Sequence, residues 1–121
     1  MASHEDLQVW QLAIDLVDLV YEMTQGFPAD ERFGLTSQLQ RAAVSVPANI
    51  AEGAGRESTK DFLRHLSIAQ GSLAEVRTLF VIADRREYIT CSEFEHARKE
   101  TESVAKLLMG LRNSLRRKLR D

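Results

Sequence analysis

Apolar residues recur at steps of three and four along most of the chain, which is the spacing of one face of an α-helix. This pattern predicts helices at about residues 7–25, 34–53, 59–86 and 91–119. The alternation of apolar and polar residues that marks half-buried strands is absent from the sequence. We therefore expect an all-α fold with one domain over residues 1–121.

The first predicted helix carries more apolar residues than one core-facing stripe needs, and Asp6 is its expected N-cap. One apolar line contains Leu7, Trp10, Ile14, Val17, Tyr21 and Thr24, and a second contains Val9, Leu12, Leu16, Leu19 and Met23. A helix of an isolated four-helix bundle buries one broad stripe. Either the bundle wraps this helix deeply or another subunit covers the remainder, and we favour another subunit.

The second predicted helix has a line of polar residues on one face, which we call the polar seam. Its members are Gln38, Arg41, Ser45, Asn49 and Glu52. An apolar line beside it contains Leu35, Leu39, Ala42, Val46 and Ile50. We interpret the seam as a structural network that sets bundle register or lines a subunit contact, in preference to a ligand site. Its partners would be on the third helix, such as Gln70, Ser72 or Glu75. Arg41→Ala should then lower stability or assembly.

Proline and glycine residues set the expected bend and end of this helix. Pro47 lies inside it, removes a backbone donor and clashes with the carbonyl of Ala43. We therefore expect a Pro-kinked second helix, unless the helix breaks at Val46. Gly53 and Gly55 are expected to end it.

The third and fourth helices keep a seven-residue apolar repeat, which predicts left-handed, nearly parallel bundle packing. The first repeat is Thr59, Phe62, Leu66, Ala69, Leu73, Val76, Phe80 and Ala83. The second is Phe94, Ala97, Thr101, Val104, Leu108, Leu111 and Leu115. Capping boxes are expected at Ser58 with Asp61 and at Thr90 with Glu93.

Smaller features predict how the helices are joined and how closely they pack. Gly26 is expected to end the first helix in a left-handed conformation. Phe27 and Phe33 are expected to pin the connector to the end of the bundle. Gly71 and Ser72, in the middle of the third helix, would let another backbone approach closely.

Composition fits a soluble globular protein, with 28% charged and 44% hydrophobic residues. The net charge of −2 does not indicate a polyanion-binding protein as a whole. Residues 105–121, however, hold six basic residues against one acid. Candidate nucleic-acid contacts in this basic segment are Arg112, Arg116, Arg117, Lys118 and Arg120. We favour the alternative interpretation, in which these cations complement the helix dipole.

Three features of the sequence predict a cytoplasmic location. The one cysteine, Cys91, excludes an intrachain disulfide and fits a reducing environment. The first residues show no signal peptide. We also expect no membrane association, since no apolar run reaches the ~20 residues of a bilayer span.

Candidate catalytic chemistry is sparse, and we predict no enzyme, no cofactor and no metal. The histidines His4, His65 and His96 are scattered, and Glu93 with His96 forms a single E-x-x-H pair where di-iron bundles need two. The glycines near residue 54 follow a helix, whereas phosphate loops open one. Cys91 is interpreted as a surface thiol.

Four runs resemble one family along most of the chain, from about residue 6 to residue 115. They are DLQVWQLAIDLVDLVY, GLTSQLQRAAVSVPANIAEGAGR with FLRHLSIAQGSLAEVRTL after it, and MGLRNSL. The most specific motif is RAAVSVPANIAEG, at residues 41–53. Together they resemble the four-helix-bundle family of bacterial 23S rRNA intervening-sequence proteins.

The resemblance implies an up-down-up-down antiparallel four-helix bundle that assembles as a homopentamer of unknown cellular role. It also implies a fold similar to the accessory variability determinant of diversity-generating retroelements, a pentameric barrel that binds nucleic acid through basic surface. We expect a non-enzymatic interaction or scaffold module. The alternative is RNA or DNA binding by the basic segments, gathered on one face of the oligomer.

Overall fold

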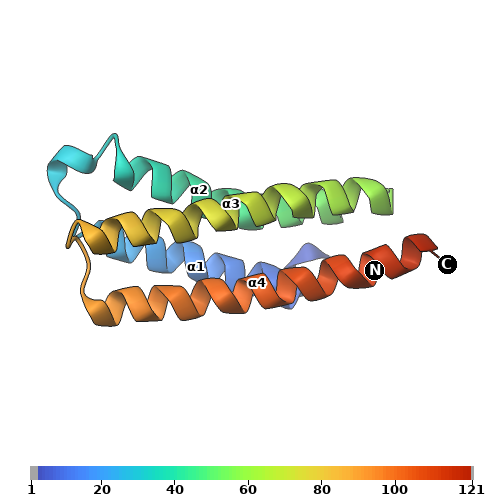
Figure 1. Cartoon of the computed structure of the whole chain (residues 1–121). Coiled ribbons are helices and arrows are strands. Elements are labelled where there is room, and N and C mark those ends of the chain that lie inside the picture. Colours follow the sequence, from blue (N-terminus) through green and yellow to red (C-terminus); the bar gives the residue numbers. More distant parts are fainter. Residues whose placement is uncertain (1–2, 121) are drawn as a thin grey trace.

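The four predicted stretches fold as long α-helices because each carries an apolar stripe that the other three cover (Figure 1). The computed structural model describes residues 3–120. Its helices are α1 (Gln8–Thr24), α2 (Leu35–Ala54), α3 (Thr59–Arg85) and α4 (Cys91–Arg120), with short 3-10 turns η1 (His4–Asp6) and η2 (Ala29–Glu31). Every predicted bound lies within one residue of the observed one, and the all-α prediction is confirmed.

Successive helices run in opposite directions, so the fold is the expected up-down-up-down antiparallel four-helix bundle (Figure 1). Each helix packs against its neighbours in the chain, and α1 also packs against α4. Within residues 3–120 the backbones of the diagonal pairs α1–α3 and α2–α4 do not come close to each other. Figure 1 shows the α1–α2 connector and the α3–α4 turn at one end, and both chain ends at the other.

The predicted apolar lines of α2, α3 and α4 form the core. All five residues of the α2 line are buried. The buried members of the two repeats are Leu66, Ala69, Leu73, Val76, Phe80 and Ala83 in α3, and Ala97, Thr101, Val104, Leu108 and Leu115 in α4. The hydroxyl of Thr101 donates to the carbonyls of Ala97 (3.0 Å) and Arg98 (2.9 Å). This buried polar group is therefore satisfied within its own helix.

The buried face of helix α1 matches neither of its two predicted apolar lines in full. It takes residues from both lines and adds Ala13 and Val20. Its fully buried residues are Val9, Ala13, Leu16, Val20, Met23 and Thr24. Trp10, Ile14 and Val17 are only half-buried, and Tyr21 is 46% exposed. The bundle therefore covers this apolar line in part: Trp10 and Val17 pack against the core with one side, and Tyr21 is left exposed.

Helices α2 and α3 are the most closely packed pair, and Gly53 shows why. A β-carbon at Gly53 would lie 2.8 Å from Cβ of His65 and 2.9 Å from a ring carbon of Phe62. The expectation of close approach is also confirmed for Ser72, whose hydroxyl shares a 2.8 Å hydrogen bond with Ser45 across the two helices. It is wrong for Gly71, which faces open space.

Helix α2 continues through Pro47 to Ala54, so a break at Val46 is wrong, and the kink remains a prediction. Gly55 does follow the helix, but with a right-handed φ of −83°. Gly53 is part of the helix, and its missing side chain serves packing against α3. The glycines here therefore act through their small size.

The connector after α1 differs from expectation in two ways. Gly26 is not left-handed, since among the described residues only Glu87, in the α3–α4 turn, has a positive φ. Phe27 is buried against Tyr88, with ring centres 5.5 Å apart, but Phe33 is 87% exposed and pins nothing. Glu31 supplies the missing tie: its carboxylate accepts from Leu35 N (3.1 Å) and from the Tyr88 hydroxyl (2.9 Å).

Helix starts follow the predicted capping in part. The Thr90–Glu93 box is complete, with backbone-to-side-chain bonds of 3.0 and 2.8 Å. Ser58 Oγ accepts from Asp61 N at 3.0 Å. Asp6 does not cap α1; it closes a capping box on η1, and Leu7 occupies the N-cap of α1 without a side-chain bond.

Helix α3 is long and apolar enough to cross a bilayer by length and composition, with a mean hydropathy of 1.3 over 18 residues. This corrects the expectation that no segment reaches that threshold. The core helix of a soluble bundle passes the same test, and the apolar repeat of α3 is buried against its neighbours. The absence of membrane association remains a prediction.

We expect Gly53→Ala to lower the free energy of unfolding by roughly 1–3 kcal/mol, because the added methyl group pushes α2 away from α3. Urea denaturation measures the change. Gly71→Ala is the matched control: it has room for the methyl group, and we expect it to raise stability by about 0.5–1 kcal/mol. Equal effects of the two substitutions would contradict the close-approach role of Gly53.

The bond from the Leu35 amide, followed by the bond from the Tyr88 hydroxyl, lowers the pKa of Glu31 below its usual 4.5. A group whose pKa is lowered by folding stabilises the fold above its unfolded pKa, and this contribution is lost as pH falls through the folded value. We expect wild type to lose more stability than Glu31→Gln on acidification through this range. If the melting temperatures of the two proteins fell equally as the pH is lowered, the stabilising hydrogen bonds to the Glu31 carboxylate would be refuted.

Candidate functional site

The middle of the polar seam joins α2 to α3. Asn49 Nδ2 donates to the carbonyl of Ser45 (2.9 Å) and to its hydroxyl (3.0 Å), which in turn bonds Ser72 of α3. Ser72 is the one partner proposed from the sequence that forms a bond here. These half-buried polar groups satisfy one another across the helix pair, as a register-fixing network requires.

A buried histidine that the sequence left unassigned completes this network. His65 of α3 is 4% exposed, and its Nδ1 lies 3.3 Å from Oδ1 of Asn49 and 3.6 Å from Oε2 of Glu52. Its Nε2 lies 3.2 Å from the guanidinium of Arg64. Because arginine can only donate, Nε2 of His65 accepts the hydrogen bond from Arg64. The proton of the ring is therefore on Nδ1, which donates to Oδ1 of Asn49. The ring is thus a structural connector between the two helices.

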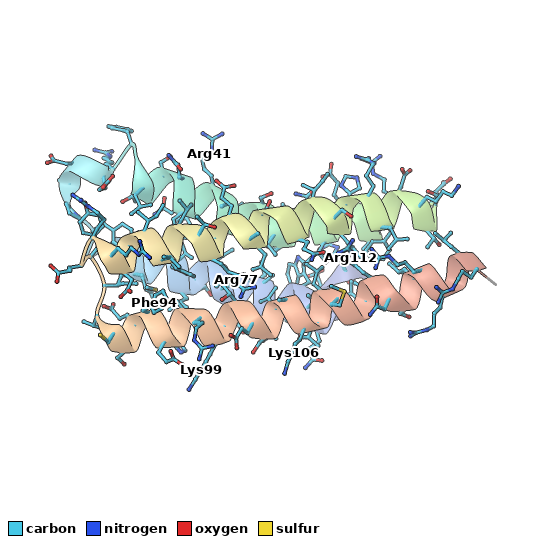
Figure 2. The ribbon with its side chains drawn as sticks, viewed as in Figure 1. Arg41, Arg77, Phe94, Lys99, Lys106 and Arg112 are labelled. Carbon is cyan, nitrogen blue, oxygen red and sulfur yellow. The ribbon has the colours of Figure 1, made fainter. Side chains whose placement is uncertain are left out.

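The ends of the polar seam are solvent-exposed. Figure 2 shows Arg41 pointing away from the bundle, and within residues 3–120 it has no hydrogen bond or ion pair. Glu52 forms a surface ion pair with Arg56 at 3.6 Å. Gln38 is exposed and, with Arg41 and Glu75, lines an open polar groove of about 430 Å³. The contacts give no support for a stabilising role of Arg41 within one chain, and its effect on assembly remains a prediction.

The basic segment forms the last turns of α4, where Figure 1 shows the helix reaching beyond the other three. Four of the five candidate contacts, Arg116, Arg117, Lys118 and Arg120, are exposed. Arg112 instead lies along the α3–α4 junction (Figure 2), and its Nη2 donates to Ser67 Oγ at 3.3 Å. Burial, then the charge of Arg116, lowers the pKa of Arg112. The structure therefore brings four candidate contacts together and separates the fifth.

Metal-binding and catalytic groups do not converge. Among the described residues no three His, Cys, Asp or Glu side chains are grouped as metal ligands. The carboxylate of Glu93 is used by its capping box, and His96 lies at an acidic hollow of about 270 Å³ between α1 and α4. Cys91 is exposed at the start of α4.

Sequence reasoning missed a hollow between α3 and α4, which we call the aromatic hollow. It measures about 150 Å³ and is lined by Arg77, Phe80, Val81, Phe94, Arg98 and Thr101. Figure 2 shows Arg77 and Phe94 between the two helices. Arg98 bonds Glu95 and Glu102 on its own helix, which raises the pKa of Arg98 and lowers that of Glu95. The apolar repeats of α3 and α4 include Phe80, Phe94 and Thr101 of this lining, but they gave no sign that Arg77 and Arg98 lie beside them.

The chain also leaves an apolar α1–α2 face, formed by Trp10, Ile14, Val17, Tyr21 and Val44. The first four follow one line of α1, and Tyr21 and Val44 border the same surface hollow of about 410 Å³. Val44 is 42% exposed. This face contains most of the apolar line for which the sequence predicted a further burial partner.

Comparison with known proteins agrees with this architecture. A solved structure of a protein of unknown function, from the S23 ribosomal protein family of Bacteroides thetaiotaomicron VPI-5482, is similar with a TM-score of 0.80. The two chains share 24% sequence identity, and the match covers 87% of this chain and 95% of that one. This likeness concerns the fold. A search of curated proteins finds no match. The profile of the 23S rRNA-intervening sequence protein family matches residues 5–110, so the chain belongs to that family.

Proposed function

We propose that this protein is a self-assembling helical bundle that forms a closed homo-oligomeric ring and serves as a non-catalytic interaction or scaffold module in the cytoplasm. Five copies is the number that the family resemblance implies. The observation that carries the proposal is the apolar α1–α2 face, which a second copy would cover. Two of its residues, Tyr21 (46%) and Val44 (42%), are exposed and the other three are half-buried, and apolar surface left uncovered on a small helical protein favours an interaction site.

The α1–α2 face is preorganised for a partner. Its side chains sit on two helices that are tied together by Gln40, whose Nε2 donates to the hydroxyl of Thr24 at 3.0 Å. The Thr24 hydroxyl donates in turn to the carbonyl of Tyr21 at 3.2 Å. Covering such a fixed surface costs little conformational entropy, so the buried apolar area contributes fully to association.

The cross-section of the bundle supports a closed ring. On the α2–α3 side, Gly53 and the Ser45–Ser72 pair let two helices approach closely. On the α1–α4 side, Leu19 and charged neighbours leave a hollow of about 270 Å³. The backbones of α2 and α3 thus approach each other more closely than those of α1 and α4. We infer from this difference that the protomer is wedge-shaped in cross-section. If each copy places its α1–α2 face on the α3–α4 face of the next, every copy is rotated by the same angle relative to the last, and the ring can close.

We expect wild type to have several times the 13.7 kDa mass of one chain, five times if the ring is a pentamer. Val44→Arg should reduce it to a monomer, because the charge would be buried in the contact. Light scattering at micromolar concentration measures the mass.

Leu119→Arg is the matched control, since Leu119 is also exposed (47%) but lies on the end of α4. It should leave the mass unchanged, and circular dichroism should show folded helices for both variants. A monomeric wild type would refute the proposed assembly.

A second candidate function, nucleic-acid binding, rests on the exposed basic segment. Arg116, Arg117, Lys118 and Arg120 lie within two turns at the end of α4. In a ring whose axis runs along the helices, every copy would present these cations at the same end. The summed positive field would then attract phosphates although one chain has a net charge of −2.

Replacing all four cations by Ala should weaken binding to a structured RNA by about tenfold or more and flatten its salt dependence, because each phosphate contact adds about 0.7–0.9 to the log–log slope. Lys99→Ala with Lys106→Ala is the control, since these exposed lysines lie on the outer side of α4 in its middle (Figure 2). Titrations at several salt concentrations test this. Equal binding by the four-cation variant and wild type would exclude these four cations as the site.

A further inference from the structure

The α3–α4 face has an aromatic hollow that no side chain of its own chain fills, and the α1–α2 face has an exposed aromatic side chain. We propose that Tyr21 of one copy inserts into the aromatic hollow of the next copy. This inference rests on the proposed ring and names the contact that would build it. It makes the interface heterologous, with a different surface on each of the two partners.

The size and chemistry of the hollow fit a phenol ring. Its volume is about 150 Å³, and an engineered protein cavity of about that volume holds one benzene molecule. Phe80, Val81 and Phe94 provide apolar walls, whereas Arg77, Arg98 and Thr101 provide polar groups. Tyrosine needs this combination, because its ring is apolar and its hydroxyl requires a hydrogen-bonding partner when buried.

Tyr21 is suited to act as the inserted group. It is 46% exposed and lies on the last turn of α1, a helix held at this point by the Thr24–Gln40 bond. Phe33 is more exposed, at 87%, but lies on the connector and stacks under Arg32, whose guanidinium is 5.2 Å from the ring centre. Since a helix fixes the direction of its side chains, insertion of Tyr21 costs less entropy.

The two surfaces lie at the same height along the bundle. Tyr21 is three residues before the end of α1, and Phe94 is three residues after the start of α4. Both ends belong to the end of the bundle where the connector meets the α3–α4 turn, joined by the bond between Glu31 and Tyr88. Copies related by rotation about an axis along the helices would therefore bring Tyr21 level with the hollow.

Charge supports the same pairing. Next to Tyr21 on α1, the exposed carboxylates of Asp18 and Glu22 line the hollow toward α4, and on its other side Arg41 of α2 borders the same hollow as Tyr21. At the hollow, Arg77 is exposed and forms no ion pair with any residue of 3–120, whereas Arg98 is already paired with Glu95 and Glu102. Docking would give Arg77 an acidic neighbour and place a guanidinium beside the phenol ring, which adds a cation–π attraction.

The experiment cross-links neighbouring copies in a Cys91→Ser background. Chains with both Tyr21→Cys and Val81→Cys should form, on oxidation, a ladder of covalent multimers on denaturing gels that ends at the ring size. Chains with only one of these substitutions carry a single thiol and should therefore form nothing larger than a covalent dimer. The control pair Tyr21→Cys with Lys106→Cys, on the outer side of α4, should give no ladder.

The outcomes separate this contact from assembly itself. A double-cysteine chain that has the wild-type oligomeric mass but gives no ladder would overturn the Tyr21 contact and leave the ring standing, whereas a monomeric wild type would overturn both. A ladder from Phe33→Cys with Val81→Cys, in place of the Tyr21 pair, would assign the hollow to the connector and overturn the inference.

A second measurement uses variants without cysteines. Tyr21→Ala should raise the dissociation constant of the oligomer by about tenfold or more, in the range of an interface hot spot. Tyr21→Phe should keep most of the affinity, because the ring still fills the hollow. Sedimentation at a series of concentrations measures both, and wild-type affinity for Tyr21→Ala would contradict the proposal.

Discussion

The close packing of α2 against α3 is the constraint on which the rest of the structure depends. Gly53 leaves no side chain between the helices, and Ser45 and Ser72 are small enough for their hydroxyls to bond directly. Asn49 and His65 then fix the relative position of the two helices. A polar contact of this kind is directional, so it specifies one register where leucine packing would tolerate several.

This constraint determines the shape of the molecule. The closer approach of α2 to α3 than of α1 to α4 is what favours a wedge-shaped protomer, with the α1–α2 and α3–α4 sides as its two slanting faces. The polar seam lies on the narrow side, and the apolar α1–α2 face and the aromatic hollow lie on the slanting ones. The surfaces proposed for self-association are therefore a consequence of how the core is packed.

The basic segment is largely independent of this packing. It lies at the C-terminal end of α4, whose tip passes the end of the bundle, and its Arg112 bonds Ser67 of α3. Its charge is local, and it becomes a strong field only if several copies align. The two proposals are thus linked in one direction: the proposed ring does not need the cations, but the proposed nucleic-acid binding needs the ring.

The sequence by itself determined the helices, because helical periodicity and capping are local: the α3 repeat and the Thr90–Glu93 box hold as predicted. It also placed the polar seam. Only the tertiary structure decided which seam residues find partners, since Asn49 meets His65 whereas Arg41 meets solvent. The same holds for Phe27 and Phe33, one buried and one exposed, and for the aromatic hollow. These outcomes depend on distances between helices far apart in the chain, which no local pattern specifies.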